Sequence, residues 1–334
     1  MMNELSQSEH IDVTSAGRTT AAKNVGVLGF AVFMCAMLAI PMVSNQRWLA
    51  VATTFLVFSV VALSQDIVLG KGGMFHMGHA MFFGLGAYTT AILNMTFHVP
   101  VLWSLPAAII IPALFGILLA GPIVHLRGDY LLVATVGFNM VFVQALENDV
   151  FGVTGGPNGI FGIGSPHIFG FTLSSETSVY YFAMVVFVFT LVVMRNLENS
   201  KAGRALHYLR EDALAAESIG INTRVYKIFA FGLGAGLAGL AGAVYAVQYS
   251  AVSPDAFNFL QSVLFFSIVI VGGSSIPGVL LGVAVMFVLP EAFRQFAEWR
   301  YFIFGFAMIL AMILRPKGIW PAKFGRIPGY LTKG

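Results

Sequence analysis

Long apolar stretches separated by short polar segments dominate the pattern of this chain. Each long stretch approaches the roughly 20 mostly apolar residues that an α-helix needs to cross about 30 Å of hydrocarbon in a bilayer. The pattern predicts an all-α polytopic transmembrane helical bundle. We expect about ten spans, near residues 25–43, 48–69, 75–97, 101–124, 130–150, 178–194, 228–250, 259–272, 277–290 and 300–314.

The eighth and ninth of these segments are short for a full crossing. They are separated by Gly272-Gly273-Ser274-Ser275, which interrupts the apolar pattern. Broken or re-entrant helices occur in membrane proteins where irregular backbone packs against protein or lines a cavity. We therefore expect residues 259–290 to contain a broken or re-entrant element.

The composition supports a membrane location. Hydrophobic residues make up 58% of the 334 residues and charged residues only 10%, whereas a soluble globular protein is about 25% charged. The mean hydropathy is +0.84. The single cysteine, Cys35, excludes an internal disulfide and a multi-cysteine metal site. We expect no metal and no other cofactor.

The distribution of Lys and Arg predicts the orientation. If the N-terminus is cytoplasmic and the spans alternate, only Arg47, Arg294 and Arg300 of the 18 basic residues fall in outer segments. Cytoplasmic loops of membrane proteins carry an excess of basic residues. We therefore expect a multi-pass membrane protein with both termini in the cytoplasm. The net charge of +3 reflects these loops and does not indicate a nucleic acid partner.

The chain is expected to form one membrane domain. Residues 1–24 are polar and lack the basic start and short apolar core of a signal peptide, so they predict a disordered cytoplasmic tail. Residues 25–320 predict the membrane domain, and residues 321–334 a second cytoplasmic tail. The longer loops are an outer one at 151–177 and an inner one at 195–227.

The inner loop contains a candidate docking segment. Residues 210–220 favour a short amphipathic helix that ends at a glycine, a residue that commonly terminates helices. Two adjacent alanines offer a small flat surface flanked by charged residues. Such a helix suits docking to a protein partner, and a solvated linker helix is the alternative. The candidate docking residues are Arg210, Glu211, Asp212, Ala215, Ala216, Glu217 and Gly220.

This loop resembles the cytoplasmic loop of branched-chain amino acid ABC transporter permeases. The segments that carry the resemblance here are Ala202-Gly203-Arg204-Ala205-Leu206, Arg210-Glu211-Asp212 and Gly220-Ile221-Asn222. Further matching segments follow in the family's order over roughly residues 60–320: Gly78-His79-Ala80, Gly86-Ala87-Tyr88, Leu126-Arg127-Gly128-Asp129-Tyr130, the sequence TGGPNGI at 154–160, Leu289-Pro290-Glu291 and Arg315-Pro316-Lys317-Gly318. The RGDY and TGGPNGI segments resemble the larger of the two permease types.

The resemblance implies a permease subunit of an ATP-driven importer. Its partners would be a second related permease, two P-loop ATPase subunits and an external substrate-binding protein, with membrane lipid around the helices. The loop would hold the coupling helix, whose general pattern is Glu-Ala-Ala, three residues, then Gly. Ala215, Ala216 and Gly220 fit this spacing, and Leu214 replaces the acid. The implied mechanism is alternating access, with branched-chain amino acids as substrates or, in related systems, urea, short amides or aromatic acids.

Two other classes of function are less well supported by the sequence. An ion-coupled secondary transporter would favour a buried acid or a cation site at broken helices near the midplane. A membrane enzyme would need a convergent set of catalytic groups, and the polar residues here are scattered among different spans. No Walker pattern occurs, because Gly70-Lys71 is followed by Gly72. We expect ATP hydrolysis on partner subunits and no enzymatic activity in this chain.

Polar residues inside the spans are candidates for the translocation path, because polar groups are costly in lipid and often functional. His76 and His79 are three residues apart and are expected to share a helix face in the third span. A hydrogen-bonded packing role is favoured over a metal pair. The candidate path residues are His79, Phe83, Tyr88, Asn139 and Gln144.

Residues 232–242 carry small residues at intervals of four. Gly232 and Gly236 are four apart, as are Ala235 and Gly239, and Ala238 and Gly242. This spacing places small residues on one helix face, where two backbones can approach closely. The glycines Gly232, Gly236, Gly239 and Gly242 are therefore candidate helix-packing residues, in a static seam or in one that lets helices slide.

Overall fold

A computed structural model describes the protein over most of its apolar segments. The described residues are 33–42, 44–126, 128–150, 152–168, 171–172, 175–292, 302, 305, 306, 309, 313 and 318–320. The predicted tails at 1–24 and 321–334 lie outside this part of the chain, as do most of the span at 300–314 and part of the span at 25–43. The chain divides into two compact units, residues 1–49 and 50–334.

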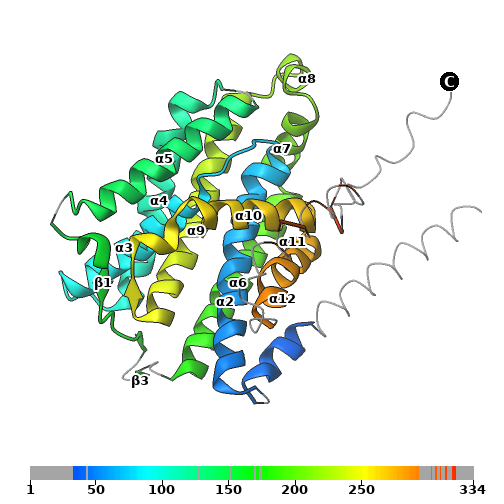
Figure 1. Ribbon diagram of the computed structural model, residues 1–334. Helices are drawn as coiled ribbons and strands as arrows, with labels where there is room; N and C mark the ends of the chain where they lie inside the picture. Colours follow the sequence, from blue (N-terminus) through cyan, green and yellow to red (C-terminus); the bar gives the residue numbers. More distant parts are fainter. Residues whose placement is uncertain are drawn as a thin grey trace, which may run out of the picture. The chain divides into compact units, whose positions relative to one another are not determined.

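Helices dominate the described chain (Figure 1). The helix Phe33–Met42 lies in the first unit, and α2 begins there. The first half contains α2 (Gln46–Asp66), the π-helical turn η1 (Ile67–Lys71), α3 (His79–Met95), α4 (Val101–Ile123), α5 (Asp129–Glu147), the 3-10 turn η2 (Gly156–Asn158), β1 (Ile160–Phe161), β2 (His167–Ile168) and β3 (Phe171–Thr172). The second half contains α6 (Glu176–Asn199), α7 (Lys201–Glu211), α8 (Ala213–Ser218), α9 (Thr223–Tyr249), β4 (Ala251–Val252), the 3-10 turn η3 (Pro254–Phe257), α10 (Phe259–Gly272), α11 (Ile276–Val283), the π-helical turn η4 (Ala284–Val288) and α12 (Leu289–Ala292).

Short polar residues set where many of these helices begin. The side chains of Ser200, Asn222 and Asn258 each accept a hydrogen bond from a backbone N–H three residues later, at the starts of α7, α9 and α10. Ser275 does the same for α11. A side-chain oxygen at this position satisfies one of the N–H groups that the first helical turn leaves unpaired.

The predicted all-α membrane bundle is confirmed. Within the described residues, six helices are long and apolar enough to cross a membrane by length and composition: Gln46–Lys71, Val101–Ile123, Asp129–Glu147, Glu176–Asn199, Thr223–Tyr249 and Pro254–Gly272. Shorter apolar helices occur at Phe33–Met42 and Ile276–Ala292. The total of ten spans stays a prediction.

The third predicted span begins later than expected. The prediction of a helix from residue 75 is wrong, because residues 73–78 are not helical and α3 starts at His79. The backbone N–H of Met77 donates to Thr135 Oγ1 at 3.1 Å, and Gly78 packs against the carbonyl of Thr135. Contacts with α5 therefore replace the helical pairing that this segment would otherwise make.

Helix α9 packs closely against both α3 and α4. A Cβ atom at Gly239 would clash with the carbonyl oxygen of Ala108 in α4, and one at Gly242 with that of Phe83 in α3. Gly232 lies against the side chain of Ile117, because a Cβ there would be 2.7 Å from its Cγ1. The small residues thus allow backbone to approach backbone on two sides of α9.

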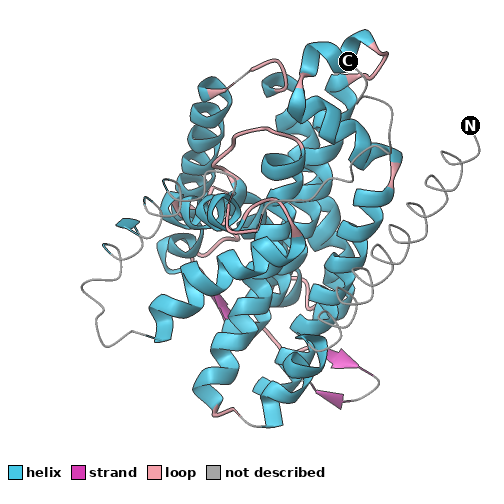
Figure 2. Cartoon of the chain, turned by 90° about the vertical axis from the view of Figure 1, so that its right-hand side faces the viewer, coloured by secondary structure: helices cyan, strands magenta, loops and turns pink. Residues whose placement is uncertain are grey.

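The strands are short and make local contacts. β1 pairs with β4 in antiparallel register, Ile160 opposite Val252, and β2 pairs with β3. Figure 2 shows the strands only in the lower half of the view, where they join the ends of long helices. The β1–β4 pair holds the loop after α5 against the residues that follow α9.

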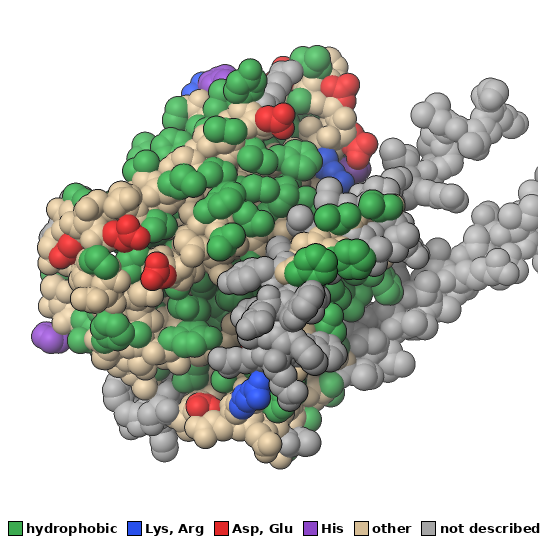
Figure 3. Space-filling view, in the orientation of Figure 1, with side chains coloured by type: hydrophobic (Ala, Val, Ile, Leu, Met, Phe, Trp, Pro, Cys, Tyr) green, Lys and Arg blue, Asp and Glu red, His purple; other side chains and the backbone are tan. Residues whose placement is uncertain are grey.

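Hydrophobic side chains cover much of the molecular surface, as expected for a protein in lipid. In Figure 3 they form the broad middle of the face, and most charged side chains lie toward its edges. Only 28% of an apolar 18-residue stretch of α4 is buried inside the protein, against 89% of the corresponding stretch of Gln46–Lys71. Trp103, Leu114 and Leu118 of α4 are 76%, 60% and 69% exposed. These residues form a surface suited to lipid contact.

The Gly239 contact predicts a strong effect of the smallest possible substitution. Gly239→Ala should lower the thermal unfolding temperature of the chain in detergent, because overpacking costs about 1–3 kcal/mol. Gly137→Ala in α5 is the matched control, since open space surrounds that position and alanine favours a helix by up to about 1 kcal/mol. Equal unfolding temperatures for both variants would contradict the close packing of α9 on α4.

Candidate functional site

The predicted docking helix over 210–220 is divided in two. Arg210 and Glu211 belong to α7, and α8 begins only after Asp212. Asp212 has an extended backbone, and its Oδ1 accepts hydrogen bonds from the N–H groups of Leu214 and Ala215 at 2.9 and 3.1 Å. This carboxylate caps a new helix. The prediction of one continuous helix is therefore wrong.

Large apolar side chains are exposed around α8. Leu214 is 63% exposed and Ile219 is 67% exposed, whereas Ala216 is only 2% exposed. These two side chains are the large apolar groups that α8 and the residue after it present to solvent. Sequence reasoning did not select Leu214 or Ile219 as docking residues, although apolar residues in a charged loop were the available signal. Ala216 instead packs inside the protein.

The remaining candidate docking residues lie in different settings. Glu211, Asp212, Ala215, Glu217 and Gly220 are all exposed. Gly220 has φ +84, a left-handed conformation that glycine adopts readily, and it is the second residue after α8. The guanidinium of Arg210 points back to the bundle, where Nη1 donates to the carbonyl oxygen of Gly70 at 2.6 Å.

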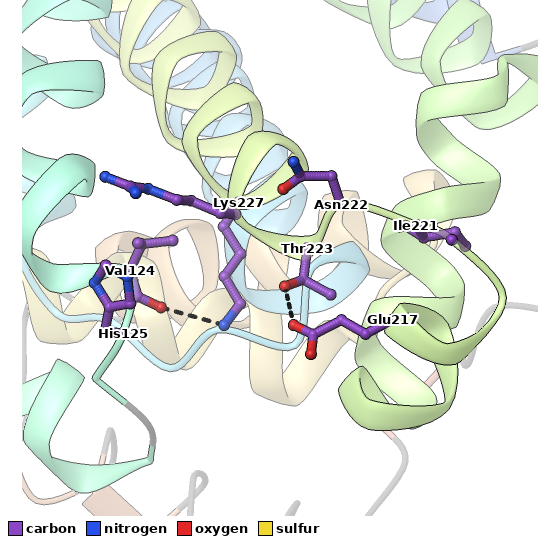
Figure 4. Close-up of a pocket in the computed structure, with 9 residues that line it drawn as sticks. Val124, His125, Glu217, Ile221, Asn222, Thr223 and Lys227 are labelled. Atoms are coloured by element: carbon purple, nitrogen blue, oxygen red, sulfur yellow. Dashed lines mark hydrogen bonds between the residues drawn. The ribbon is translucent and has the colours of Figure 1, made fainter.

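A pocket of ≈ 480 Å³ lies beside α8, at the start of α9 and the end of α4 (Figure 4). Thr223 Oγ1 donates to Glu217 Oε1 at 2.5 Å, and Lys227 Nζ donates to the carbonyl oxygen of Val124 at 3.3 Å. The first bond joins the last turn of α8 to α9, and the second joins α9 to the end of α4. Its walls also include His125.

Four of the five candidate path residues are buried in the bundle. His79, Phe83 and Asn139 are fully buried and Tyr88 is 3% exposed. Gln144 is exposed, and its Nε2 donates to Glu147 Oε2 at 3.2 Å. The structure therefore buries the first four and leaves Gln144 exposed.

The four buried candidates form two groups. Phe257 contacts all three members of the first group, Phe83, Tyr88 and Asn139. Its ring lies 5.3 Å from that of Phe83 and 6.0 Å from that of Tyr88, and its carbonyl accepts from Asn139 Nδ2 at 3.3 Å. Ser262 Oγ in α10 contacts Asn139 Oδ1 at 3.4 Å. The residues come from α3, α5, η3 and α10. Sequence patterns did not indicate Phe257, because one phenylalanine among 31 carries no distinct signal.

The histidines form the second group. The expectation that His76 and His79 share a helix face is wrong, because His76 precedes α3; their rings are nevertheless 5.2 Å apart. Ser64 Oγ and His79 Nε2 form a hydrogen bond of 2.7 Å. Both ring nitrogens of His76 lack a hydrogen-bond partner among the described residues. Among the residues that the structure describes, no group of three or more His, Cys, Asp or Glu side chains could hold a metal ion.

Charged residues meet at the end of α2. Asp66 is fully buried and Lys71 is 5% exposed. Lys71 Nζ lies 3.6 Å from Asp66 Oδ2 and 2.6 Å from Glu198 Oε1 at the end of α6. A buried charge is stable only when it is paired, so this contact fixes α2 to α6. Sequence reasoning assigned Lys71 to a loop and gave no role to Asp66 or Glu198.

The loop after α5 is held by a local hydrogen-bonded turn. Asp149 Oδ1 accepts from the N–H of Thr154 at 2.7 Å and from its hydroxyl at 2.8 Å. The backbone hydrogen bond from Thr154, followed by that from its hydroxyl, lowers the pKa of the Asp149 carboxyl. The turn places Gly155 and Gly156, both with positive φ, at the start of the TGGPNGI segment.

The apolar bundle and its closely packed helices define a multi-pass helical membrane protein. The chain belongs to the family of the branched-chain amino acid transport system / permease component, whose model matches residues 47–312. The family predicted from the sequence motifs is therefore confirmed, and with it the class of transport permeases.

Individual relatives agree with this assignment. The chain is 33% identical to the high-affinity branched-chain amino acid transport system permease protein LivM of Salmonella typhimurium, over 87% of this chain and 75% of the relative. It is 28% identical to BraD of Pseudomonas aeruginosa, over 78% and 91%. Identity to LivH of Salmonella typhimurium is 25%, over 78% and 90%. No solved structure matches the chain.

The Asp149 turn predicts a pH-dependent stability difference. Because the folded-state pKa of Asp149 is lowered, its contribution is present at neutral pH and is lost as the pH falls from about 4 through that lower value. Asp149→Asn should therefore lower the unfolding temperature at pH 7, and the difference from the unchanged chain should be smaller at pH 3. Thermal unfolding in detergent measures this. An equal difference at both pH values would contradict the role of the carboxylate charge.

Proposed function

We propose that this chain forms half of the translocation path of an ATP-driven importer for branched-chain amino acids. A second, related permease supplies the other half, two P-loop ATPase subunits bind the inner loop, and an external substrate-binding protein delivers the substrate. ATP binding and release on the ATPases drive alternating access. The hydrolytic sites reside on the partner subunits, and this chain has no enzymatic role.

The observation that carries this proposal is the exposed surface of α8. Leu214 and Ile219 place apolar side chains in solvent on a short helix that Asp212 caps and Gly220 ends. Apolar side chains exposed together on a polar loop are available to a protein partner, which would remove them from water on docking. The family of the chain makes an ATPase subunit the partner that fits best.

The relatives support the pairing with a second permease. LivM and LivH of Salmonella typhimurium are both named as permease proteins of a high-affinity branched-chain amino acid transport system. The identity of this chain is higher to LivM than to LivH. We assign the LivM-type position to this chain and the LivH-type position to its partner.

The proposed topology follows from the charges. The inner loop, α7 and α8 face the cytoplasm, together with tails at 1–24 and 321–334, and residues 25–320 form the permease domain in the bacterial inner membrane. The loop after α5 then faces the external binding protein. The buried cluster of His79, Phe83, Tyr88 and Asn139 is proposed as part of the wall that moves when the path opens.

Two alternatives remain distinct from this proposal. The same importer architecture serves urea, short amides or aromatic acids in related systems. In an ion-coupled transporter, the buried carboxylate of Asp66 would be the first candidate for ion binding, but a cation of the protein, Lys71 Nζ, already lies 3.6 Å from it.

Substitutions on α8 test the docking surface. Leu214→Glu and Ile219→Glu should each reduce the amount of ATPase subunit that co-purifies with the tagged chain, by about tenfold or more, as loss of an interface hot spot does. The second permease should remain bound. Quantitative mass spectrometry of complexes purified in mild detergent measures both. Ala216 is unsuitable for this test because its substitution would disturb packing inside the protein.

Val150→Glu is the matched control for these variants. Val150 is also a large exposed apolar residue, at 60%, but it lies on the loop after α5, so its replacement should leave ATPase binding unchanged. Recovery of the unchanged chain alone or as a homo-oligomer, with no ATPase in several detergents, would contradict the importer proposal.

Uptake assays test the substrate class. Proteoliposomes that contain the complex and receive binding protein outside and ATP inside should accumulate radiolabelled leucine. Excess unlabelled isoleucine or valine should compete with this uptake, and urea, acetamide or phenylalanine should not. Uptake of urea or phenylalanine in place of leucine would assign the chain to a related substrate class. Uptake driven by a proton or sodium gradient without ATP would contradict the energy source.

A further inference from the structure

The end of α2 is not an ordinary helix terminus. The helix continues into the π-helical turn η1, which brings Lys71 back toward Asp66, so that the two charges lie 3.6 Å apart. Both residues are buried, and all five residues of η1 are buried as well. Insertions of this kind frequently mark functional positions in helices. Here the insertion places a cation inside the protein, beside the segment that leads to α3.

The end of α6 and the end of α7 both contact this turn. Glu198 stands at the end of α6, three residues before α7 begins, and its Oε1 accepts from Lys71 Nζ at 2.6 Å. Arg210 lies in the last turn of α7 and donates to Gly70 O at 2.6 Å. The last carbonyls of a helix have no partner within the helix, and a cationic side chain satisfies them well. Two separate charge-assisted bonds, one from the end of α6 and one from α7, thus reach the same five-residue turn, and only Ser200 separates the two helices.

Backbone packing reinforces these two bonds. Gly73 has φ +66 and lies directly against Arg210, because a Cβ atom at Gly73 would be 3.0 Å from Arg210 Cγ. A Cβ atom at Gly70 would be 2.5 Å from Ser274 Oγ. Ser274 belongs to the turn between α10 and α11. The turn η1 therefore lies between α7 on one side and the α10–α11 turn on the other.

Because α8 lies next to α7 in the chain, a displacement of α8 can reach the contacts at η1. Only Asp212 separates α7 from α8, so a force on α8 reaches α7 through one residue. Arg210 and Glu198 then pass it to η1 and α2. Another route from α8 is the bond of Glu217 to Thr223 in α9. The contacts at η1 differ from it in that they end on a buried turn, where Lys71 lies between two acids.

We propose that the Lys71–Glu198 and Arg210–Gly70 contacts are the mechanical link between the docking helix and the membrane helices. This inference rests on the proposed function. In the transport cycle the two contacts hold α7 and the end of α2 together as one body. Displacement of α8 by the ATPases then moves α2, together with the packed turn between α10 and α11. Arg210 and Glu198 are positioning residues that do not contact the substrate.

The test separates ATP hydrolysis from transport in the same vesicles. Proteoliposomes with the complete complex are supplied with binding protein, leucine and ATP, and leucine uptake and phosphate release are measured together. Arg210→Met and Glu198→Gln should each lower the leucine carried per phosphate released by about tenfold, as loss of a coupling of typical size does. The ATPase subunits should remain in the purified complex. Arg210→Lys keeps a cationic donor and should recover most of the uptake.

Arg204→Met is the matched control. Arg204 lies on α7 six positions before Arg210, it is exposed, and its Nη1 donates to the carbonyl oxygen of Asn199 at 3.2 Å, not to η1. The ratio of leucine to phosphate should therefore stay unchanged in this variant.

The possible outcomes separate the link from the proposed function. Loss of the ATPases from the Arg210→Met complex would make Arg210 a docking residue and overturn the link. An unchanged ratio in both Arg210→Met and Glu198→Gln would also overturn it, while the importer proposal would stand. Absence of ATP-dependent leucine uptake with the unchanged chain would instead contradict the proposed function itself.

Discussion

The structure depends on the close approach of α9 to α3 and α4. Lipid offers no hydrophobic gain for helix association, so van der Waals contact between backbones must supply much of the stabilisation. Gly239 and Gly242 permit that contact on two sides of α9, and Gly86 of α3 meets the backbone of Gly239 from the other direction. A side chain at any of these positions would separate helices that hold the rest of the bundle in place. The exposed apolar faces of α4 and α6 can then be left to lipid.

This rigid group determines where irregular backbone is tolerated. Residues 73–78 run between η1 and α3 without helical pairing, and protein contacts such as the Met77–Thr135 bond satisfy their polar groups. Such backbone is stable at membrane depth only when protein encloses it. The same enclosure brings His76, Asp66 and Lys71 into the interior. The polar interior and the glycine packing therefore follow from one constraint, the close packing of helices in lipid. Both lie close to the helices that lead to α7.

Much of the fold could be predicted from the sequence, because a bilayer imposes a length and a composition on each span. The segments at 101–124, 228–250 and 259–272 each contain a helix close to the expected bounds. The start of α3 could not be predicted, since it depends on Thr135, a residue almost 60 positions away. The division of the docking segment depended on the side chain of Asp212, a visible but ambiguous capping signal. The charges at Asp66 and Glu198 could not be paired from sequence, because their meeting requires the fold of α6 against α2.

The central claim is that α7, α8 and the end of α2 move together during transport. Cryo-EM structures of the complete complex without nucleotide and with ATP bound would test it most directly. We expect α8 to shift between the two states while Lys71 stays within ion-pair distance of Glu198 and Arg210 stays hydrogen-bonded to Gly70 O. The end of α2 should then shift with α8. Displacement of α8 with both contacts broken and α2 unmoved would contradict it.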